Sequence, residues 1–360
     1  MPEAFDAASE PPAAGSHAAS PRVETADVSD PRWDSYVAAS PRATFFHRAG
    51  WQRVAAATFP YRPAHLWALR GERVVGILPL FEIRGFPWGR TLVSVPLGVY
   101  GGVAADDEAG ARALLAAAKE NGRNRGARYI ELRGGARFEE LPAKDLYVTF
   151  RKELDPDPEV NMARIPRNQR RSIRIALKNG LEHRLGREDL LGDFYRIYSH
   201  SVRNLGSPVF PKSLFANLLV EFGDAATILG VFREGVMVGG VFTFFDRGEV
   251  LPYYGGALKP AFKYAVNDFM YWSLMGVAAE RGCRVFDFGR SKKGSGSYHF
   301  KRHWGFEPME LAYQYDLVRD RAIPDLSPRN PRFSLAIRVW RRLPLAVTER
   351  VGPILVRFFP

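Results

Sequence analysis

The chain has 360 residues, which is room for about two domains of ordinary size. Its content of 46% hydrophobic and 25% charged residues is that of a globular protein and excludes wholesale disorder, collagen and a pure coiled coil. A single cysteine, Cys283, excludes a disulfide framework and a cysteine-based zinc cluster. The net charge of +12 favours acidic partners, namely nucleic acid, phosphorylated substrates or anionic lipid, although charge also serves solubility alone.

The first 30 residues are rich in Ala, Ser, Pro and acidic residues, which predicts a disordered tail over 1–30. They have neither the basic start nor the apolar segment of a secretory signal. No uninterrupted apolar run reaches the ~18 residues that a transmembrane helix needs. Together with the lone cysteine, this predicts a cytoplasmic protein.

A weak internal repeat is the most informative feature of the sequence. Three short sequence segments recur in the same order, at offsets of 163, 154 and 156 residues. The pairs are Val75-Gly76 with Val238-Gly239, Tyr100-Gly101-Gly102 with Tyr254-Gly255-Gly256, and residues 125–132 with residues 281–288. The shared order predicts a duplication, and the alternative is coincidence of common strand and turn words.

Each half reads as a β-hairpin, a strand, a helix and a final strand. Apolar spacing predicts the helices over 107–123 and 266–281, and Gly126 and Gly282 follow as stop signals. This pattern predicts an α/β (α+β) fold with mixed sheets, in two domains over 31–150 and 151–320. The order of elements resembles the GNAT acyltransferase fold used twice in tandem.

A strongly basic helix is expected over residues 166–178, at the start of the second half. Arg164, Arg167, Arg171, Arg174 and Lys178 recur every three or four residues and so share one helix face. Like charges at this spacing repel one another, which favours an anionic partner over a merely solvated face. Arg170 and Arg171 are the candidate phosphate ligands of this helix. Two more helices are expected over 190–205 and 211–222.

Residues 284–308 hold the densest chemical pattern. A strand ends near Phe288, and a loop rich in Gly, Ser and Lys follows from Gly289 to Gly296. Its backbone N–H groups, with the cations Arg290 and Lys301, suit a phosphate group. The Walker A pattern and the G-x-S-x-G elbow are absent from the sequence. His299 and His303 lie four residues apart but have no third ligand beside them, so no metal site is expected.

At these residues the sequence resembles the FemAB-like transferases, and more narrowly their branch associated with PEP-CTERM/exosortase exopolysaccharide systems. The resemblance covers about residues 30–350. It is carried by the basic helix Arg167–Arg171 with 175–181, by Asn267 with Trp272, by Phe286–Arg290, and by Gly294-Ser295-Gly296 leading to Tyr298, Phe300, Lys301, Trp304 and Gly305.

The resemblance implies two GNAT-like domains and transfer of an acyl group to an amine, in the service of the cell envelope or of exopolysaccharide synthesis. Characterised relatives take an amino acid from aminoacyl-tRNA and add it to a peptidoglycan precursor. The donor implied here is aminoacyl-tRNA or an acyl-thioester, the acceptor is an anionic small molecule or glycan precursor, and no tightly bound cofactor is expected.

One departure concerns the donor. Acetyl-CoA enzymes of the GNAT type carry a Q/R-x-x-G-x-G/A loop before a helix. The corresponding stretches, residues 101–111 and 256–268, both lack this glycine pattern. This weakens an acetyl-CoA interpretation and leaves tRNA as a partner open.

The resemblance also implies roles for single residues. It places Lys301 where a lysine supports the tetrahedral intermediate and Phe300 beside the donor, and a plain surface lysine is the alternative. As a loop residue Lys301 is expected to be replaceable by Met with little change in melting temperature. Further candidates are Asp287 and Arg290 in catalysis, His200 as a weak general base, and substrate contacts at the following residues: Tyr254, Asn267, Gly294, Gly296 and Tyr298. Glu131 and Tyr100, the repeat mates of Asp287 and Tyr254, argue for structural roles instead.

The C-terminal residues 321–360 carry eight basic and two acidic residues among apolar ones. Such a tail either packs on the body or lies on an anionic membrane, which would give peripheral contact with the inner membrane. Pro344 and Pro353 are expected to prevent one continuous helix. The overall prediction is an acyltransferase, and the alternative is a non-catalytic module that binds a polyanion or a polysaccharide. The oligomeric state is left open.

Overall fold

The computed structural model describes residues 20–85, 89–324 and 334–358. The first part of the chain contains, in order, β1 (Arg22–Thr25), α1 (Pro31–Ala39), η1 (Phe45–His47), α2 (Ala49–Thr58), β2 (Arg62–Pro63), β3 (Leu66–Arg70), β4 (Arg73–Leu78), β5 (Phe81–Gly85), β6 (Gly89–Val93), β7 (Ala104–Ala105), α3 (Glu108–Asn124), β8 (Ile130–Arg133) and β9 (Ala143–Glu153).

The second part contains α4 (Pro158–Ala163), α5 (Arg167–Leu177), β10 (Leu181–Gly186), α6 (Glu188–Leu205), α7 (Lys212–Phe222), η2 (Gly223–Ala225), β11 (Ala226–Arg233), β12 (Val236–Asp246), β13 (Glu249–Ala257), η3 (Lys259–Tyr264), α8 (Val266–Glu280), β14 (Val285–Asp287), β15 (Ser291–Lys292), α9 (Gly296–His303), β16 (Pro308–Asp316), α10 (Ser334–Trp340) and α11 (Leu345–Val356).

A strand–helix–strand unit with parallel strands occurs in both parts, in agreement with the predicted repeat. In the first part α3 connects β6 to β8, which pair in parallel. In the second part α8 connects β13 to β14, which also pair in parallel. Both helices end before a glycine with positive φ, Gly126 at +62° and Gly282 at +74°, as expected for helix stop signals. The mixed α/β class predicted from the sequence is therefore observed.

The two parts differ in how the hairpin strand continues. At the repeat offset of 163 residues, Pro79 corresponds to Phe242. The chain breaks at Pro79 into β4 and β5, which belong to different sheets, whereas β12 runs on through a bulge at Phe242 and Thr243. Proline lacks the N–H that a central strand must donate, which favours a break at Pro79. In the second part, β13 accommodates Pro252 beside the register shift with β12 and stays continuous.

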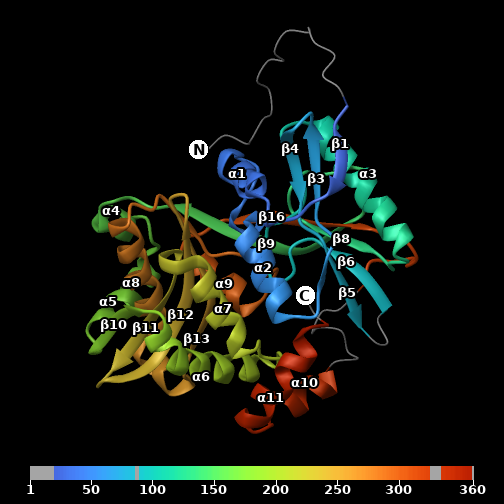
Figure 1. Ribbon diagram of the computed structural model, residues 1–360. Helices are drawn as coiled ribbons and strands as arrows, with labels where there is room; N and C mark the ends of the chain where they lie inside the picture. Colours follow the sequence, from blue (N-terminus) through green and yellow to red (C-terminus); the bar gives the residue numbers. More distant parts are fainter. Residues whose placement is uncertain (1–19, 86–88, 325–333, 359–360) are drawn as a thin grey trace.

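Within the described residues, a small sheet has the order β1-β3-β4-β7, and a large one has the order β10-β11-β12-β13-β14-β9-β16-β8-β6-β5-β2, with β15 beside β9. Figure 1 shows β9 running between the two parts of the molecule. β9 pairs with β14 of the second part and with β16, and β16 in turn pairs with β8 of the first part. One continuous sheet thus joins the two repeats, and its centre brings them into contact.

Helices cover this sheet with apolar faces that the sequence spacing predicts. The buried residues of α6 recur every three or four positions, and α6 packs against β12 and β13: Leu190, Leu191, Phe194, Ile197 and Tyr198. The predicted helices over 190–205 and 211–222 are confirmed as α6 and α7, and the basic helix over 166–178 as α5.

Several boundaries predicted from the sequence are wrong. Residues 22–25, assigned to a disordered tail, form β1 and pair with β3; the first 19 residues lie outside the described part. The domain boundary at 150/151 falls inside β9. By contrast, the C-terminal segment does form two separate helices, as its prolines predict: Pro344 precedes α11, although Pro353 lies within that helix. The errors at β1 and β9 have the same origin, since strand pairing outweighs local composition.

Candidate active site

The carboxylate of Asp287 lies at the end of β14, at the centre of the large sheet, and the residue is only 2% exposed. Its Oδ1 accepts hydrogen bonds from the backbone N–H of Gly289 at 2.7 Å and from the hydroxyl of Tyr100 at 3.1 Å. Its Oδ2 has no hydrogen-bond donor in the described part of the chain, and the Nε of Arg151 lies 3.6 Å away. Burial raises the pKa of Asp287 to about 6, against the opposing effect of Arg151.

Lys301 lies in helix α9 and is 7% exposed, so the expectation of a loop lysine is wrong. Its ammonium donates to three successive carbonyls, those of Phe288 at 2.6 Å, Gly289 at 2.9 Å and Arg290 at 3.2 Å. Burial lowers the pKa of Lys301 to about 7, although Asp287 favours the charged form. All three N–H groups of the ammonium are engaged, so Lys301 ties α9 to the chain immediately after Asp287.

Arg290 follows this tied segment and is enclosed by aromatic rings. Its guanidinium donates to the hydroxyl of Tyr313 at 3.0 Å and lies over the ring of Tyr147, 4.8 Å from the centroid. The Tyr313 hydroxyl donates onward to the carbonyl of Val99 at 3.1 Å. Because β16 carries Tyr313 into the sheet between β8 and β9, the position of Arg290 depends on both repeats.

The remaining predicted residues of α9 line one wall of this cluster. The ring of Phe300 lies 6.4 Å from that of Phe288, and the ring of Tyr298 packs edge-on against Phe150 at 5.6 Å. Gly294 has a φ of +68°, which glycine adopts readily. A Cβ built on Gly296 would meet no atom within 4 Å, so nothing in the fold itself requires glycine there.

The structure brings Asp287, Arg290 and Lys301 together but leaves other predicted residues apart from them. Tyr254 lies in β13 among the rings of α6 and α7, and its buried hydroxyl has no partner among the described residues. Asn267 is half-buried in the first turn of α8. In α5, Arg171 is exposed and Arg170 donates to the carbonyl of Ala163 at 3.2 Å. His200 is half-buried in α6, and burial lowers its pKa.

Sequence reasoning missed the groups that the first repeat supplies. Tyr100 was assigned a role in the fold, yet its hydroxyl contacts Asp287 and the hydroxyl of Thr149 on β9. Arg151, also on β9, provides the nearest positive charge to Asp287. The Tyr-Gly-Gly word around Tyr100 marked the position, but no local pattern indicated that its partner lies 187 residues away.

The start of the crossover helix differs between the repeats. In α3, Asp107 caps the helix by accepting from the N–H of Gly110 at 2.8 Å, and Asp106 and Glu108 flank it. In α8 no side chain caps the first turn, which begins after Ala265 at a φ of +55°. Negative side chains disfavour an anion at the start of α3, whereas the first turn of α8 carries one acid, Asp268.

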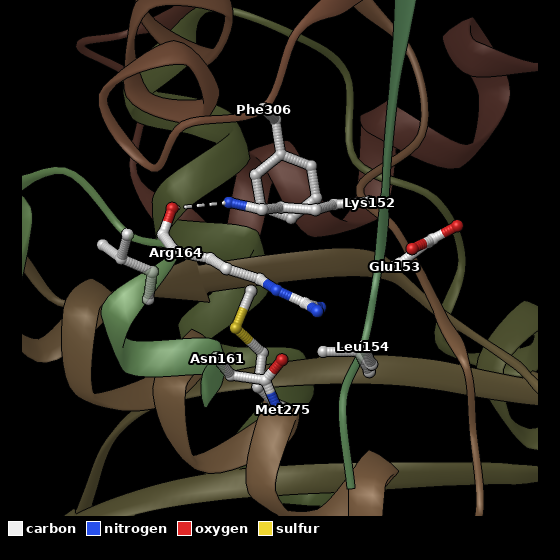
Figure 2. A pocket seen from close by; sticks show the side chains of 8 residues that line it. Lys152, Glu153, Leu154, Asn161, Arg164, Met275 and Phe306 are labelled. Atoms are coloured by element: carbon white, nitrogen blue, oxygen red, sulfur yellow. Dashed lines mark hydrogen bonds between the residues drawn. The ribbon is translucent and has the colours of Figure 1, made fainter. Parts of the chain in front are cut away.

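A small cavity is lined by residues of β9, of α4 and of α8 (Figure 2). The ammonium of Lys152 points across it and donates to the carbonyl of Arg164 at 3.0 Å, beside the ring of Phe306. Its volume of about 10 Å³ is enough for one water molecule and too small for a substrate. This contact anchors the segment before α5 and has no direct part in the site.

Within residues 20–85, 89–324 and 334–358, no three His, Cys, Asp or Glu side chains are grouped so that they could hold a metal ion. In the same ranges, no helix combines the length and apolar character needed to span a bilayer.

Comparison with known proteins supports an acyltransferase fold. Residues 166–302 match the family described as acetyltransferase (GNAT) domain. Over 129 residues the chain is 25% identical to a lipid II:glycine glycyltransferase of Staphylococcus haemolyticus (strain JCSC1435), a match that covers 33% of this chain and 31% of that protein. The chain therefore matches about a third of the length of this curated relative.

Two solved structures share the fold over most of the chain. A crystal structure of FemX has a TM-score of 0.64 at 15% identity, covering 88% of this chain and all of the other. A tandem GNAT protein from the clavulanic acid biosynthesis pathway has a TM-score of 0.55 at 13% identity, covering 84% of this chain and all of the other. The fold is thus a tandem GNAT-like α/β fold, and residues 166–302 of its second half are similar to an acetyltransferase (GNAT) domain.

Proposed function

We propose that this protein transfers an aminoacyl or other acyl group to an amine, with its reaction centre at the end of β14. The observation that carries the proposal is the cluster of Asp287, Arg290 and Lys301 inside the segment that matches the acetyltransferase domain. The first repeat supplies Tyr100 and Arg151 to the same cluster.

An amine attacks an acyl group only when it has lost its proton, and a general base is most effective when its pKa lies near the working pH. The pKa of Asp287, raised to about 6 by burial, leaves it ionised at neutral pH and still able to accept a proton. Its Oδ2 lacks a donor in the described structure, so this oxygen is the one that would receive the proton. In this proposal Tyr100 and the N–H of Gly289 hold the other oxygen in place.

Lys301 acts in this proposal by positioning other groups. Its ammonium gathers the carbonyls of Phe288, Gly289 and Arg290 and so fixes the direction in which Asp287 and Arg290 are presented. For direct contact with an oxyanion, the role suggested by the sequence resemblance, the ammonium would have to release one of these carbonyls. Arg290 provides the fixed positive charge at the site.

The substrates form the finer part of the proposal. The relative named lipid II:glycine glycyltransferase supports an amine acceptor on a cell-envelope glycan precursor. The donor we propose is aminoacyl-tRNA or an acyl-thioester. The acceptor's link to exopolysaccharide synthesis in PEP-CTERM/exosortase systems has no support beyond the sequence resemblance and stays a prediction, as does a cytoplasmic location.

The test is a donor and acceptor screen with the purified full chain. Aminoacyl-tRNAs and acyl-thioesters are offered with amine-bearing peptidoglycan and glycan precursors, and products are detected by mass spectrometry. A product of increased mass that depends on both substrates supports the proposal. If precursors bind but no donor gives turnover, the protein is the binding module that is the alternative function.

Replacing Lys301 by Met tests the positioning role within that assay. Three buried carbonyls would lose their donor, so we expect both lower turnover and a loss of about 2–4 kcal/mol in unfolding free energy. This replaces the expectation, drawn from the sequence, of an unchanged melting temperature. An unchanged melting temperature with lost turnover would instead favour direct contact between Lys301 and the substrate.

A further inference from the structure

The C-terminal helices α10 and α11 pack beside α6 at the lower edge of the molecule in Figure 1. The inner face of α11 carries Thr348, Gly352 and Val356, which are all buried. A Cβ on Gly352 would lie 2.8 Å from the backbone nitrogen of Val209, so this face of α11 packs closely against the segment between α6 and α7. The helix pair is therefore docked firmly on the body, and its opposite face is fixed in orientation.

Both helices carry large aliphatic side chains that are exposed. On α11 the exposed side chains recur every three or four residues, with Val347 at 40%, Val351 at 37% and Ile354 at 53% exposed. On α10, Leu335 is 66% and Val339 is 52% exposed. We call these five residues the C-terminal stripe. Contiguous exposed aliphatic residues of this kind mark an interaction surface.

The segment that carries the C-terminal stripe is also rich in arginine. Residues 334–358 contain five arginines, Arg338, Arg341, Arg342, Arg350 and Arg357, and one acid, Glu349. Glu349 is half-buried, and its charge acts on Tyr195 and His200 of α6, so it faces the body. The exposed residues of the two helices are therefore both aliphatic and basic, with Arg338, Arg342 and Arg350 among them.

The end of α11 leads into an open cleft of about 930 Å³ that continues this chemistry. Arg357 and Phe358 line the cleft together with further arginines and aromatic residues: Arg62, Arg84, Arg90, Phe59 and Tyr61. Two polar atoms in its lining, the Tyr61 hydroxyl and the Nε of Arg357, are buried and have no hydrogen-bond partner among the described residues.

We propose that α10 and α11 dock this protein on an anionic phospholipid bilayer. The C-terminal stripe would enter the boundary between head groups and acyl chains, and the arginines would meet lipid phosphates. A second copy of the chain would oppose one positive face with another, and a nucleic acid would leave the aliphatic stripe unused. The proposal does not depend on the proposed acyl transfer, because docking needs neither donor nor acceptor.

The experiment is co-sedimentation of the full chain with vesicles of phosphatidylglycerol and phosphatidylcholine, compared with phosphatidylcholine alone. We expect binding to the anionic vesicles that weakens with salt and little binding to the neutral ones. A four-serine variant should weaken binding by more than about tenfold; it replaces Leu335, Val347, Val351 and Ile354. A three-glutamine variant should weaken vesicle binding by about 100-fold at low salt; it replaces Arg338, Arg342 and Arg350.

Matched controls come from other exposed residues. Val220→Ser with Val236→Ser removes two exposed aliphatic residues elsewhere and should leave binding unchanged. A second control replaces Arg167, Arg171 and Arg174 of α5 by Gln. It removes the same number of charges and should also leave vesicle binding unchanged. Equal losses in the α5 variant would show unspecific attraction and overturn the proposal.

Further outcomes are equally decisive. Absence of binding to anionic vesicles by the wild type, or full binding by the four-serine variant, would overturn the proposal. So would a concentration-dependent dimer in gel filtration that the four-serine variant abolishes, because the occupant would then be a second copy. Thermal melts accompany each variant, and retained melting temperatures show that the losses come from the surface.

Discussion

The same strand–helix–strand unit occurs twice in this chain, but the two copies differ at the start of the helix and on the strand that follows it. The first crossover helix, α3, begins on Asp106, Asp107 and Glu108, two of which also pair with arginines of β3 and β4. The second, α8, begins without a side-chain cap. The acids at the start of α3 disfavour an anionic donor there more strongly than the single acid Asp268 does in the first turn of α8.

The two repeats also differ in the acid on the strand that follows each helix. On β8, Glu131 and the buried Arg133 form an ion pair at 2.8 Å, and Arg133 also lies against the backbone carbonyls of Val95 and Gly98. On β14, the equivalent Asp287 keeps one oxygen without a donor in the described structure. The same sequence segment thus holds a paired acid, Glu131, in the first repeat. In the second repeat it holds an acid, Asp287, with one oxygen that can accept a proton.

The largest expected effect separates these two acids. Asp287→Asn keeps the shape of the side chain and removes its ability to accept a proton, so turnover should fall by about 10²–10⁴-fold. Glu131→Gln, the matched change in the first repeat, should alter turnover by less than about threefold once any loss of stability is allowed for. Steady-state rates with the donor found by the screen measure both. Equal losses in the two variants would remove the functional difference between the repeats.

A second contrast concerns the two Tyr-Gly-Gly words. A Cβ on Gly102 would lie 1.8 Å from the carbonyl oxygen of Gly134, whereas on Gly256 it would meet the Cβ of Ser201 at 2.8 Å. Gly102→Ala should therefore cost about 3–5 kcal/mol of unfolding free energy, and Gly256→Ala about 1–3 kcal/mol. Urea unfolding gives both values. Gly296→Ala, with open space around the new methyl group, is the control and should be nearly neutral.

The cationic surfaces of the two parts provide the third test. On α5, Arg167, Arg171 and Arg174 are exposed. In the first part, a cleft of about 500 Å³ contains Arg125 and Arg128, which pair with Glu82 and Asp320. Because the α5 cations lie on one open face, replacing these three by Gln should reduce the salt slope for binding unfractionated tRNA by about 2–3.

The control for this test lies in the same first-part cleft. Arg90→Gln with Arg319→Gln should change the salt slope less than the α5 variant does. If the slope depends on the cleft and not on α5, the basic helix is a solvated face and the prediction drawn from its spacing is wrong.

The smallest expected effect is the pH dependence of stability. The pKa of Asp287 is raised to about 6 in the folded state, from 3.8, chiefly by burial. Such a group contributes stability that is fully present below its unfolded pKa and is lost as pH rises through about 6. The melting temperature of Asp287→Asn relative to wild type should therefore be higher at pH 8 than at pH 4, by about 2–6 °C. A difference that does not change with pH would show that Asp287 is not strained by burial.

Local patterns were sufficient for much of the fold. The helices α3, α5, α6, α7 and α8 follow from apolar or charged periodicity, and the stops at Gly126 and Gly282 follow from the φ that only glycine adopts easily. The repeat and the α/β class follow from the order of these elements. These features depend on residues close in sequence, so the sequence contains the whole signal.

For the site, the motif was sufficient to identify Asp287, Arg290 and Lys301 as candidates. The sequence did not predict how these three side chains are arranged. Whether Lys301 is free or bound to three carbonyls depends on the seating of α9 against the end of β14. Whether Asp287 meets Tyr100 depends on β9 and β16 joining the two repeats into one sheet. The sequence by itself determined which elements form and which residues carry charge. Only the tertiary structure decided which charges are buried together, because burial and partnership arise from chain segments that are far apart in sequence.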